Sequence, residues 1–166
     1  CMIDAFKYRD VATVDIPGAF LQTKMPKDEK DVHVVLDGRM AKLLAKISPS
    51  TYQEYVHKRR GQAYIYCKLN VALYGTLKAA LLFWKKLSKS LKVKGFEINP
   101  YDWCVANKDI NGTQYTIVWH VDDLKVSHVK EEVVTTFLQW LEKEYGKLHT
   151  SRGKHQQLPR HGPRLL

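Results

Sequence analysis

Two adjacent carboxylates, Asp122 and Asp123, interrupt an apolar, β-prone run that reads WHVDDLKVSH over residues 119–128. Successive side chains of a strand point to opposite faces of a sheet, so both aspartates cannot face one core. The two carboxylates repel each other, and burying either without a partner is costly. A tight turn would explain the pair, because aspartate is a good turn former. A bound divalent cation would explain it as well.

A third carboxylate that could complete a cation site is Asp15, which ends the apolar run VATVD (11–15) just before Pro17-Gly18. Two divalent ions about 3.5–4 Å apart, held by carboxylates, can activate an attacking hydroxyl and stabilise the leaving oxygen of a phosphoryl group. Hard oxygen ligands suit Mg²⁺ or Mn²⁺. Spacing alone leaves both explanations open, because the chain has 17 acidic residues.

The elements that would position these carboxylates alternate along the chain. Hydrophobic patterns predict strands at 11–15, 31–36 and 62–69, a short helix at 19–25, and two weak helices within 38–58 that break at Ser48-Pro49. Asn111-Gly112, between two β-prone runs, predicts a hairpin.

Two longer amphipathic helices are expected. In the first, which Gly95 closes, apolar residues recur at steps of three and four, while lysines give it a basic outer side: Leu73, Leu77, Ala80, Leu81, Trp84, Leu87 and Leu91 against Lys85, Lys86, Lys89 and Lys92. The second runs from Glu131 to Tyr145, with Gly146 past its end. The order of elements predicts an α+β domain with helices against an antiparallel sheet over residues 1–150, followed by an irregular tail at 151–166.

The net charge of +10 and the pI near 9.5 favour an acidic partner, with nucleic acid first and an anionic membrane second. A merely basic, solvated surface is the alternative. The three cysteines lie far apart, which indicates neither a disulfide framework nor a zinc cluster and fits a reducing intracellular compartment. The seven histidines show no ligand spacing. Neither a spanning helix nor a signal peptide is visible in the sequence.

Three motifs in order, VDIPGAFLQ (14–22), LYGTLKAALLFWKKL (73–87) and WHVDDLKVSH (119–128), resemble successive motifs of the reverse transcriptases of Ty1/copia-type retrotransposons. The stretch GFEINPYDWCVANK (95–108) is similar to the segment between the second and third motifs of that family. The resemblance covers roughly residues 1–155. It departs at His120, where the family commonly has tyrosine, and in the second motif, which is one residue longer and lacks a proline.

The resemblance implies an α+β reverse-transcriptase palm-like antiparallel sheet with packed helices, partial fingers and no thumb. The implied activity is that of an RNA-directed DNA polymerase using Mg²⁺ or Mn²⁺. Asp15, Asp122 and Asp123 would be the catalytic metal ligands, and the carbonyl of Ile16 would add a further ligand. Phe20 matches the aromatic residue that abuts the sugar of the incoming nucleotide and selects deoxynucleotides.

Tyr74 and Gly75 fall where the family's second motif packs beside nucleotide and template, and Lys78 would contact phosphate there. Each has an ordinary alternative: Phe20 is also a good core residue, Tyr74 could cap the helix, and Lys78 could lie on a solvated face. Trp84 sits on the apolar stripe and is expected in the core.

The implied partners are an RNA template, a DNA primer and deoxynucleoside triphosphates, together with the integrase and RNase H domains of a polyprotein, and no membrane. The implied location is intracellular, in a cytoplasmic virus-like particle or the nucleus. We expect the chain to be a truncated fragment that is inactive alone, with a frameshift near codon 156 that produces the tail. The alternatives are a non-catalytic nucleic-acid-binding relic of a palm and a basic domain with no retained activity.

Overall fold

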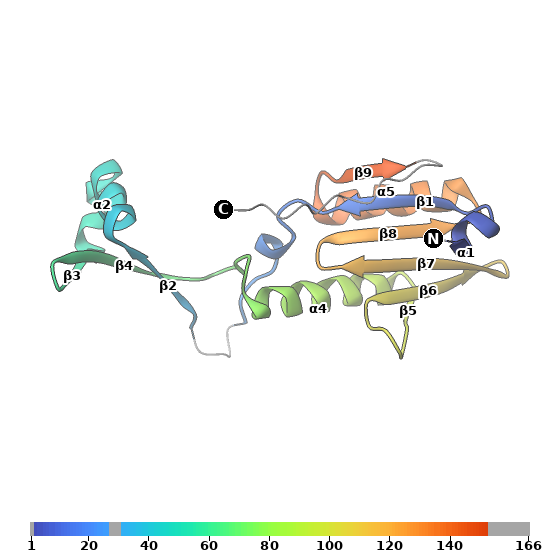
Figure 1. Cartoon of the computed structure of the whole chain (residues 1–166), viewed down its shortest axis with the longest axis horizontal. Helices are drawn as coiled ribbons and strands as arrows, with labels where there is room; N and C mark the ends of the chain where they lie inside the picture. Colours follow the sequence, from blue (N-terminus) through green and yellow to red (C-terminus); the bar gives the residue numbers. More distant parts are fainter. Residues whose placement is uncertain (1, 27–30, 153–166) are drawn as a thin grey trace.

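The structure is a computed structural model that describes residues 2–26 and 31–152. Over these ranges the chain is a mixed α+β protein with two antiparallel sheets. One sheet has six strands in the order β5-β6-β7-β8-β1-β9, and the other has three in the order β2-β4-β3. The two sheets lie in separate parts of an elongated molecule (Figure 1). The predicted α+β class with antiparallel strands is confirmed.

The large sheet contains β1 (Asp10–Asp15), β5 (Glu97–Ile98), β6 (Val105–Ile110), β7 (Thr113–His120), β8 (Asp123–His128) and β9 (His149–Arg152). The small sheet contains β2 (His33–Asp37), β3 (His57–Arg59) and β4 (Gln62–Lys68). The α-helices of the described residues are α1 (Met2–Phe6), α2 (Gly38–Ile47), α3 (Pro49–Tyr52), α4 (Leu77–Val93) and α5 (Glu131–Tyr145). Two short 3-10 helices are η1 (Ala19–Gln22) and η2 (Gln53–Tyr55).

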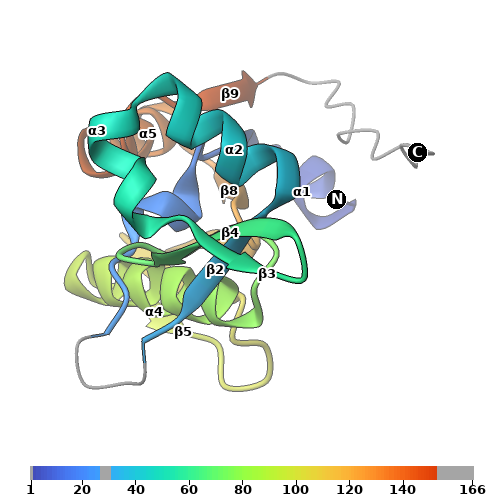
Figure 2. The ribbon, with the colours of Figure 1, turned by 90° about the vertical axis from the view of Figure 1, so that its left-hand side faces the viewer.

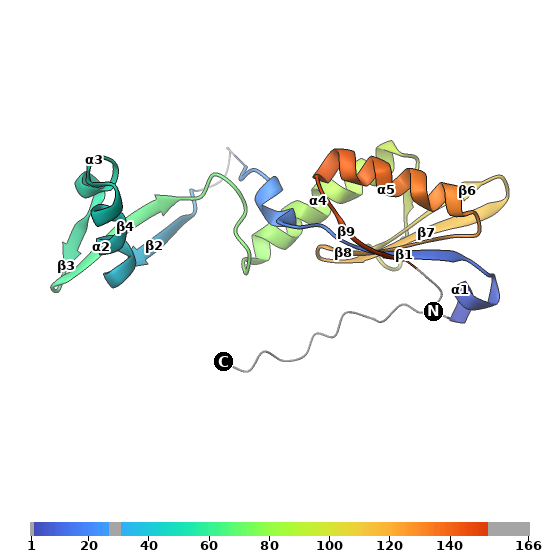
Figure 3. The ribbon, with the colours of Figure 1, turned by 90° about the horizontal axis from the view of Figure 1, so that it is seen from above.

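The main core lies between the large sheet and two helices, α4 and α5, that cover one of its faces (Figure 3). From the strands come buried residues at alternate positions, as a half-covered sheet requires: Ala12, Val14, Tyr115, Ile117, Trp119, Leu124 and Val126. From the helices come residues three and four apart: Ala79, Phe83, Leu87, Leu91, Val134, Phe137, Leu141 and Tyr145. On the opposite face of the sheet, α1 is the only helix of the described part of the chain (Figure 3).

Several predicted elements are confirmed. The hairpin between β6 and β7 turns at Asn111-Gly112, where φ is 53° and 76°, the pair of positive angles that a type I′ turn needs. Helix α5 has the predicted bounds, and Gly146 ends it with φ of 85°. The break at Ser48-Pro49 separates α2 from α3.

Helix α4 exists, and its predicted apolar stripe is right in part, because Leu87 and Leu91 are buried and Trp84 packs half-buried against the core. The stripe also included Leu73, Ala80 and Leu81, but Leu73 precedes the helix, Ala80 is exposed and Leu81 is 49% exposed. The buried face follows Ala79, Phe83, Leu87 and Leu91. Apolar residues occur on more than one side of this helix, so the surface that it packs against decides which side is buried.

The short helix expected at 19–25 is also corrected, to the single 3-10 turn η1. Gly18, with φ of 64°, starts this turn. Thr23 ends it, because its backbone is extended and both its amide and its hydroxyl donate to the carbonyl of Phe20, at 3.0 and 2.6 Å. Because the backbone is already extended at Thr23, the helix does not continue to residue 25.

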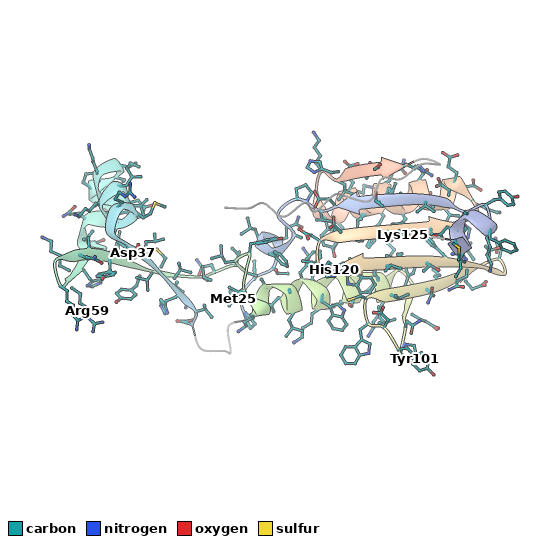
Figure 4. All side chains as sticks on the ribbon, viewed as in Figure 1. Met25, Asp37, Arg59, Tyr101, His120 and Lys125 are labelled. Atoms are coloured by element: carbon teal, nitrogen blue, oxygen red, sulfur yellow. The ribbon has the colours of Figure 1, made fainter. Side chains whose placement is uncertain are left out.

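The small sheet and helices α2 and α3 form a projection beyond one end of the large sheet, seen end-on in Figure 2. Its own core is small and consists of Ala41, Ala63 and Ile65 with partly buried neighbours. Two chain segments, residues 23–25 and 70–72, join it to the large sheet, and we call them the neck. They pair with each other, since the amide of Met25 donates to the carbonyl of Asn70 and the amide of Ala72 donates to the carbonyl of Thr23. Figure 4 labels Met25 in this neck and Asp37 and Arg59 beyond it.

Strand β9 has no counterpart among the predicted elements. It pairs with β1 and includes Ser151 and Arg152, so the sheet continues past the boundary drawn at residue 150. Arg152 anchors it through hydrogen bonds to the Asp10 carboxylate and to the hydroxyl of Thr135 in α5. Residues 153–166, on which the frameshift hypothesis rests, lie outside the described residues.

Candidate metal centre at the end of the large sheet

The three predicted catalytic aspartates meet at one end of the large sheet. In the register of β1 against β8, Asp15 is the direct partner of Asp123. Asp122 precedes it in the turn between β7 and β8, and its carbonyl accepts a hydrogen bond of 3.2 Å from the amide of Ile16. Residues more than a hundred positions apart in sequence are therefore held together by backbone pairing. This end of the sheet faces the neck, as the position of His120 in Figure 4 shows.

The turn that carries Asp122 is as short as a hairpin allows. Strand β7 ends at His120, β8 begins at Asp123, and these two residues pair, which leaves only Val121 and Asp122 between the strands. Val121 has a φ of 59°. Positive φ is strained for a β-branched residue. Such strain persists where the surroundings enforce it, and it clusters at functional sites.

Strand alternation puts the carboxylates on the open face of the sheet. In the neighbouring pair, Val14 and Leu124 are each 2% exposed, and both side chains lie under the helices. Side chains one residue further along each strand point the opposite way. Asp15 and Asp123 therefore face away from α4 and α5, and both are partly exposed.

Two histidines extend this pair into a row across four neighbouring strands. His149 of β9 pairs with Asp15, and His120 of β7 pairs with Asp123. The Nδ1 atom of His149 lies 3.0 Å from Oδ2 of Asp15. Sequence reasoning missed this contact, because β9 reads HTSR and shows no apolar alternation that would indicate a strand.

The electrostatics of the three aspartates favour a cation. Burial raises the pKa of Asp122 above its ordinary value, and the nearby charges of Asp123 and Asp15 raise it further. A backbone hydrogen bond and the nearby His120 lower it in part. Each carboxylate added to the site thus disfavours ionisation of Asp122, and a divalent cation would reverse that effect.

The donor atoms are of the chemical type that a hard divalent ion prefers, but their present positions do not converge on one ion. Carboxylate and carbonyl oxygens are the ligands that Mg²⁺ and Mn²⁺ prefer. However, within residues 2–26 and 31–152 no three side chains of His, Cys, Asp or Glu are grouped closely enough to hold a metal ion. The carbonyl of Ile16 already accepts a hydrogen bond of 3.2 Å from the amide of Ala19. Convergence on one ion would therefore require rotation of the aspartate side chains.

The residues that the resemblance places around the nucleotide are near one another. The rings of Phe20 and Tyr74 are in edge contact, with centroids 4.9 Å apart. Phe20 is 5% exposed and also touches Phe83, whereas Tyr74 is 70% exposed. Phe20 is thus a core residue here, and Tyr74 covers its outer side.

Gly75 and Lys78 lie at the start of α4. Gly75 has a φ of 85°, and a Cβ atom there would meet nothing within 4 Å, so the backbone conformation rather than close packing favours glycine. Thr76, not Tyr74, caps the helix, because its hydroxyl accepts a 3.2 Å hydrogen bond from the amide of Ala79. Lys78 is partly buried in the first turn.

A second group on the open face was not predicted. Asp4 of α1 is 6% exposed and accepts hydrogen bonds from Lys125 and Ser127 of β8. Burial raises the pKa of Asp4, but these two bonds and the Lys125 charge outweigh it, so the pKa lies below its ordinary value. This group fixes α1 to the sheet and engages the ammonium of Lys125, two residues after Asp123.

Comparison with protein families, with curated proteins and with solved structures finds no match to this chain. The helices of the described residues include none that is both long and apolar enough to cross a membrane.

Proposed function

We propose that the chain is the palm, with part of the fingers, of an RNA-directed DNA polymerase of the Ty1/copia retrotransposon type. The observation that supports this most is the register that sets Asp15 opposite Asp123, with Asp122 in the adjoining two-residue turn. Three carboxylates from two distant motifs thereby share one end of an antiparallel sheet. The small sheet beyond the neck would be the partial fingers.

In this function Asp15, Asp122 and Asp123, with the carbonyl of Ile16, would hold Mg²⁺ or Mn²⁺. When bound, the ions supply activation of the primer 3′-hydroxyl and charge stabilisation at the α-phosphate of the deoxynucleotide. The open face of the sheet leaves these carboxylates accessible to nucleic acid from the side away from α4 and α5.

The nucleotide would lie against Tyr74, whose exposed ring rests on Phe20. Because Phe20 is buried in the core, its ring is held in place, and it would support the Tyr74 ring against which a 2′-hydroxyl would clash. Lys78, in the first turn of α4, is the cation that would reach a phosphate.

The test is binding of a recessed RNA–DNA primer–template with a matching deoxynucleotide, with and without Mg²⁺, by wild type and by Asp122→Asn. The proposal predicts that Mg²⁺ tightens binding by wild type and not by the variant. Primer extension that wild type supports and the variant does not would establish polymerisation itself. Binding that ignores both Mg²⁺ and Asp122 would contradict the proposal.

That last result would favour the second candidate, a nucleic-acid-binding palm without catalysis. One observation argues against catalysis, and another argues for nucleic-acid binding. His149 occupies an oxygen of Asp15 that a metal ion would need. Helix α4 also carries five lysines and no acidic residue, which suits phosphate binding. Strong salt dependence of nucleic-acid affinity, with no metal dependence, is the behaviour expected of this candidate.

A further inference from the structure

The outer side of α4 and the loop 99–104 beside it form a surface that the metal site does not use. We define the α4–loop surface by its exposed residues Lys85, Lys89, Lys92, Tyr101 and Trp103. We propose that it binds single-stranded nucleic acid, with phosphates on the lysines and bases stacked on the rings. This deepens the proposed function by naming a strand-binding surface on α4, outside the aspartate site.

Among the described residues, the lysines of this surface have no partner of opposite sign. Lys85, Lys89 and Lys92 are exposed, and none of them forms an ion pair with any residue in the described ranges. They are spaced four and three residues apart, so they are neighbours on the helix, where like charges destabilise it. Helix α4 has no acidic residue to offset them. An anionic ligand would remove this repulsion.

Lys86, between them in sequence, behaves differently. Its ammonium lies 4.8 Å from the centre of the Tyr145 ring and 3.4 Å from the carbonyl of Gln22. The lysines of the α4–loop surface are therefore those of one side of the helix, and not simply all lysines of a solvated helix.

The loop presents two large rings to solvent. Tyr101 is 97% exposed and Trp103 is 67% exposed. Tyr101 stands at the tip of this loop, below α4 in Figure 4. The Trp103 ring lies 6.0 Å from that of Trp84 in α4, and the Trp84 indole nitrogen donates to the Trp103 carbonyl at 2.9 Å. A single exposed ring is ordinary, but a group of neighbouring exposed apolar side chains marks an interaction site.

Hydrogen bonds hold this loop in one conformation. The side-chain oxygen of Asn99 accepts from the amide of Tyr101 at 2.8 Å, and a carboxylate oxygen of Asp102 accepts from the amide of Cys104 at 2.9 Å. The amide of Asn99 in turn donates to the carbonyl of Val105, also at 2.8 Å. Because the loop is ordered in advance, ligand binding would lose little conformational entropy.

The rings and the lysines lie on adjoining strips of α4. Leu81, 49% exposed, is three residues before Trp84 and four before Lys85, so it neighbours both. From Lys85 to Lys92 the strip extends about 10 Å at 1.5 Å per residue. A strand along it would meet successive ammonium groups while its bases reach Trp103 and Tyr101.

This combination selects single strands over other anions. Aromatic rings stack on bases whose faces are free, whereas in a duplex the bases stack on each other and only the backbone is available. A ligand that used the lysines alone would leave the exposed rings unexplained.

The experiment measures the affinity of the full chain for fluorescein-labelled oligo(dT) and oligo(rU) of about 12 nucleotides, and for a duplex of the same length, by anisotropy over a salt series. Trp103→Ala and Tyr101→Ala should each weaken single-strand binding by about 5- to 100-fold. Trp103→Phe should recover most of that loss, because it keeps a stacking ring. If both oligonucleotides bind, the surface recognises features that DNA and RNA share. If only one binds, the surface distinguishes DNA from RNA by the 2′-hydroxyl.

Replacing Lys85, Lys89 and Lys92 together by glutamine should lower the slope of log affinity against log salt by about 2. The matched control replaces three exposed lysines near α5, namely Lys130, Lys143 and Lys147, with the same change in net charge. Equal losses in both triple variants, or no loss in Trp103→Ala, would overturn the proposal, as would a preference for duplex. Circular dichroism confirms that each variant is folded before its affinity is compared.

The outcomes also separate this proposal from the proposed function. Asp122→Asn tests the metal site through the Mg²⁺ effect on primer–template binding, and Trp103→Ala tests the α4–loop surface through single-strand affinity. If Mg²⁺ does not change primer–template binding by wild type while single-strand binding is intact, the polymerase proposal is refuted and the proposal for the α4–loop surface is retained.

Discussion

Neutralising Asp122 should stabilise the metal-free protein and abolish its stabilisation by Mg²⁺. The raised pKa of Asp122 shows that its ionised form is disfavoured in the fold, first by burial and then by Asp123 and Asp15. For a carboxyl with a raised pKa, the destabilisation is absent below the unfolded pKa of about 3.9 and is fully present above the folded value. Asp122→Asn should therefore gain stability at pH 7 and nothing at pH 3.

The size of the gain follows from the geometry. Asp122 lies in the turn beside the opposed pair Asp15–Asp123, so its charge is disfavoured by partial burial and by two neighbouring like charges, which together amount to about 1 kcal/mol after solvent screening. For a chain of this size that is a rise in Tm of about 2–4 °C. Mg²⁺ at about ten times its Kd should add about 1.4 kcal/mol to wild type and nothing to the variant.

The assay is thermal melting in EDTA and in a Mg²⁺ series, at both pH values. The control is Asp37→Asn, an exposed aspartate of the small sheet that should change neither the metal-free Tm nor the Mg²⁺ response. An unchanged Mg²⁺ response in Asp122→Asn would refute the assigned site. A lower Tm for that variant in EDTA at pH 7 would refute the electrostatic reasoning.

Three further changes probe the scaffold of the site. Arg152→Ala should cost about 1–3 kcal/mol in urea unfolding, because it removes charge-assisted bonds to Asp10 that hold β9 to β1; a loss under 0.5 kcal/mol would mean that β9 is held otherwise. Lys125→Met should flatten the acid limb of stability, since the lowered pKa of Asp4 makes wild type lose stability as pH falls below the unfolded pKa of about 3.9 and through the lower folded pKa; identical pH profiles would contradict this. Gly112→Ala should cost about 1–2 kcal/mol by melting, because φ is 76° and no atom lies within 4 Å of the new Cβ, so only backbone strain acts; a neutral result would mean the turn can change type.

Local signals in the sequence were enough for the elements nearest the site. Turn chemistry at Asn111-Gly112 and the 3.6-residue period of 131–145 depend on neighbouring residues only, so the hairpin and α5 could be predicted. The carboxylates of Asp122 and Asp123 likewise indicated a turn, which the structure places at Val121-Asp122.

What could not be predicted depends on long-range partners. The buried side of α4 is chosen by the sheet it packs on, and nothing in its own sequence separates Phe83 from Leu81. Strand β9 is polar throughout and exists because it extends the edge of β1, with Arg152 reaching Asp10. His149 becomes a partner of Asp15 only through that pairing.

The central claim, that Asp15, Asp122 and Asp123 form one divalent-metal site, is tested most directly by paramagnetic broadening with Mn²⁺. In the amide spectrum of the labelled chain, substoichiometric Mn²⁺ should broaden first the signals of Ile16, Asp122 and Asp123, and Asp122→Asn should abolish that selectivity. Broadening centred elsewhere, or the same pattern in the variant, would contradict the account.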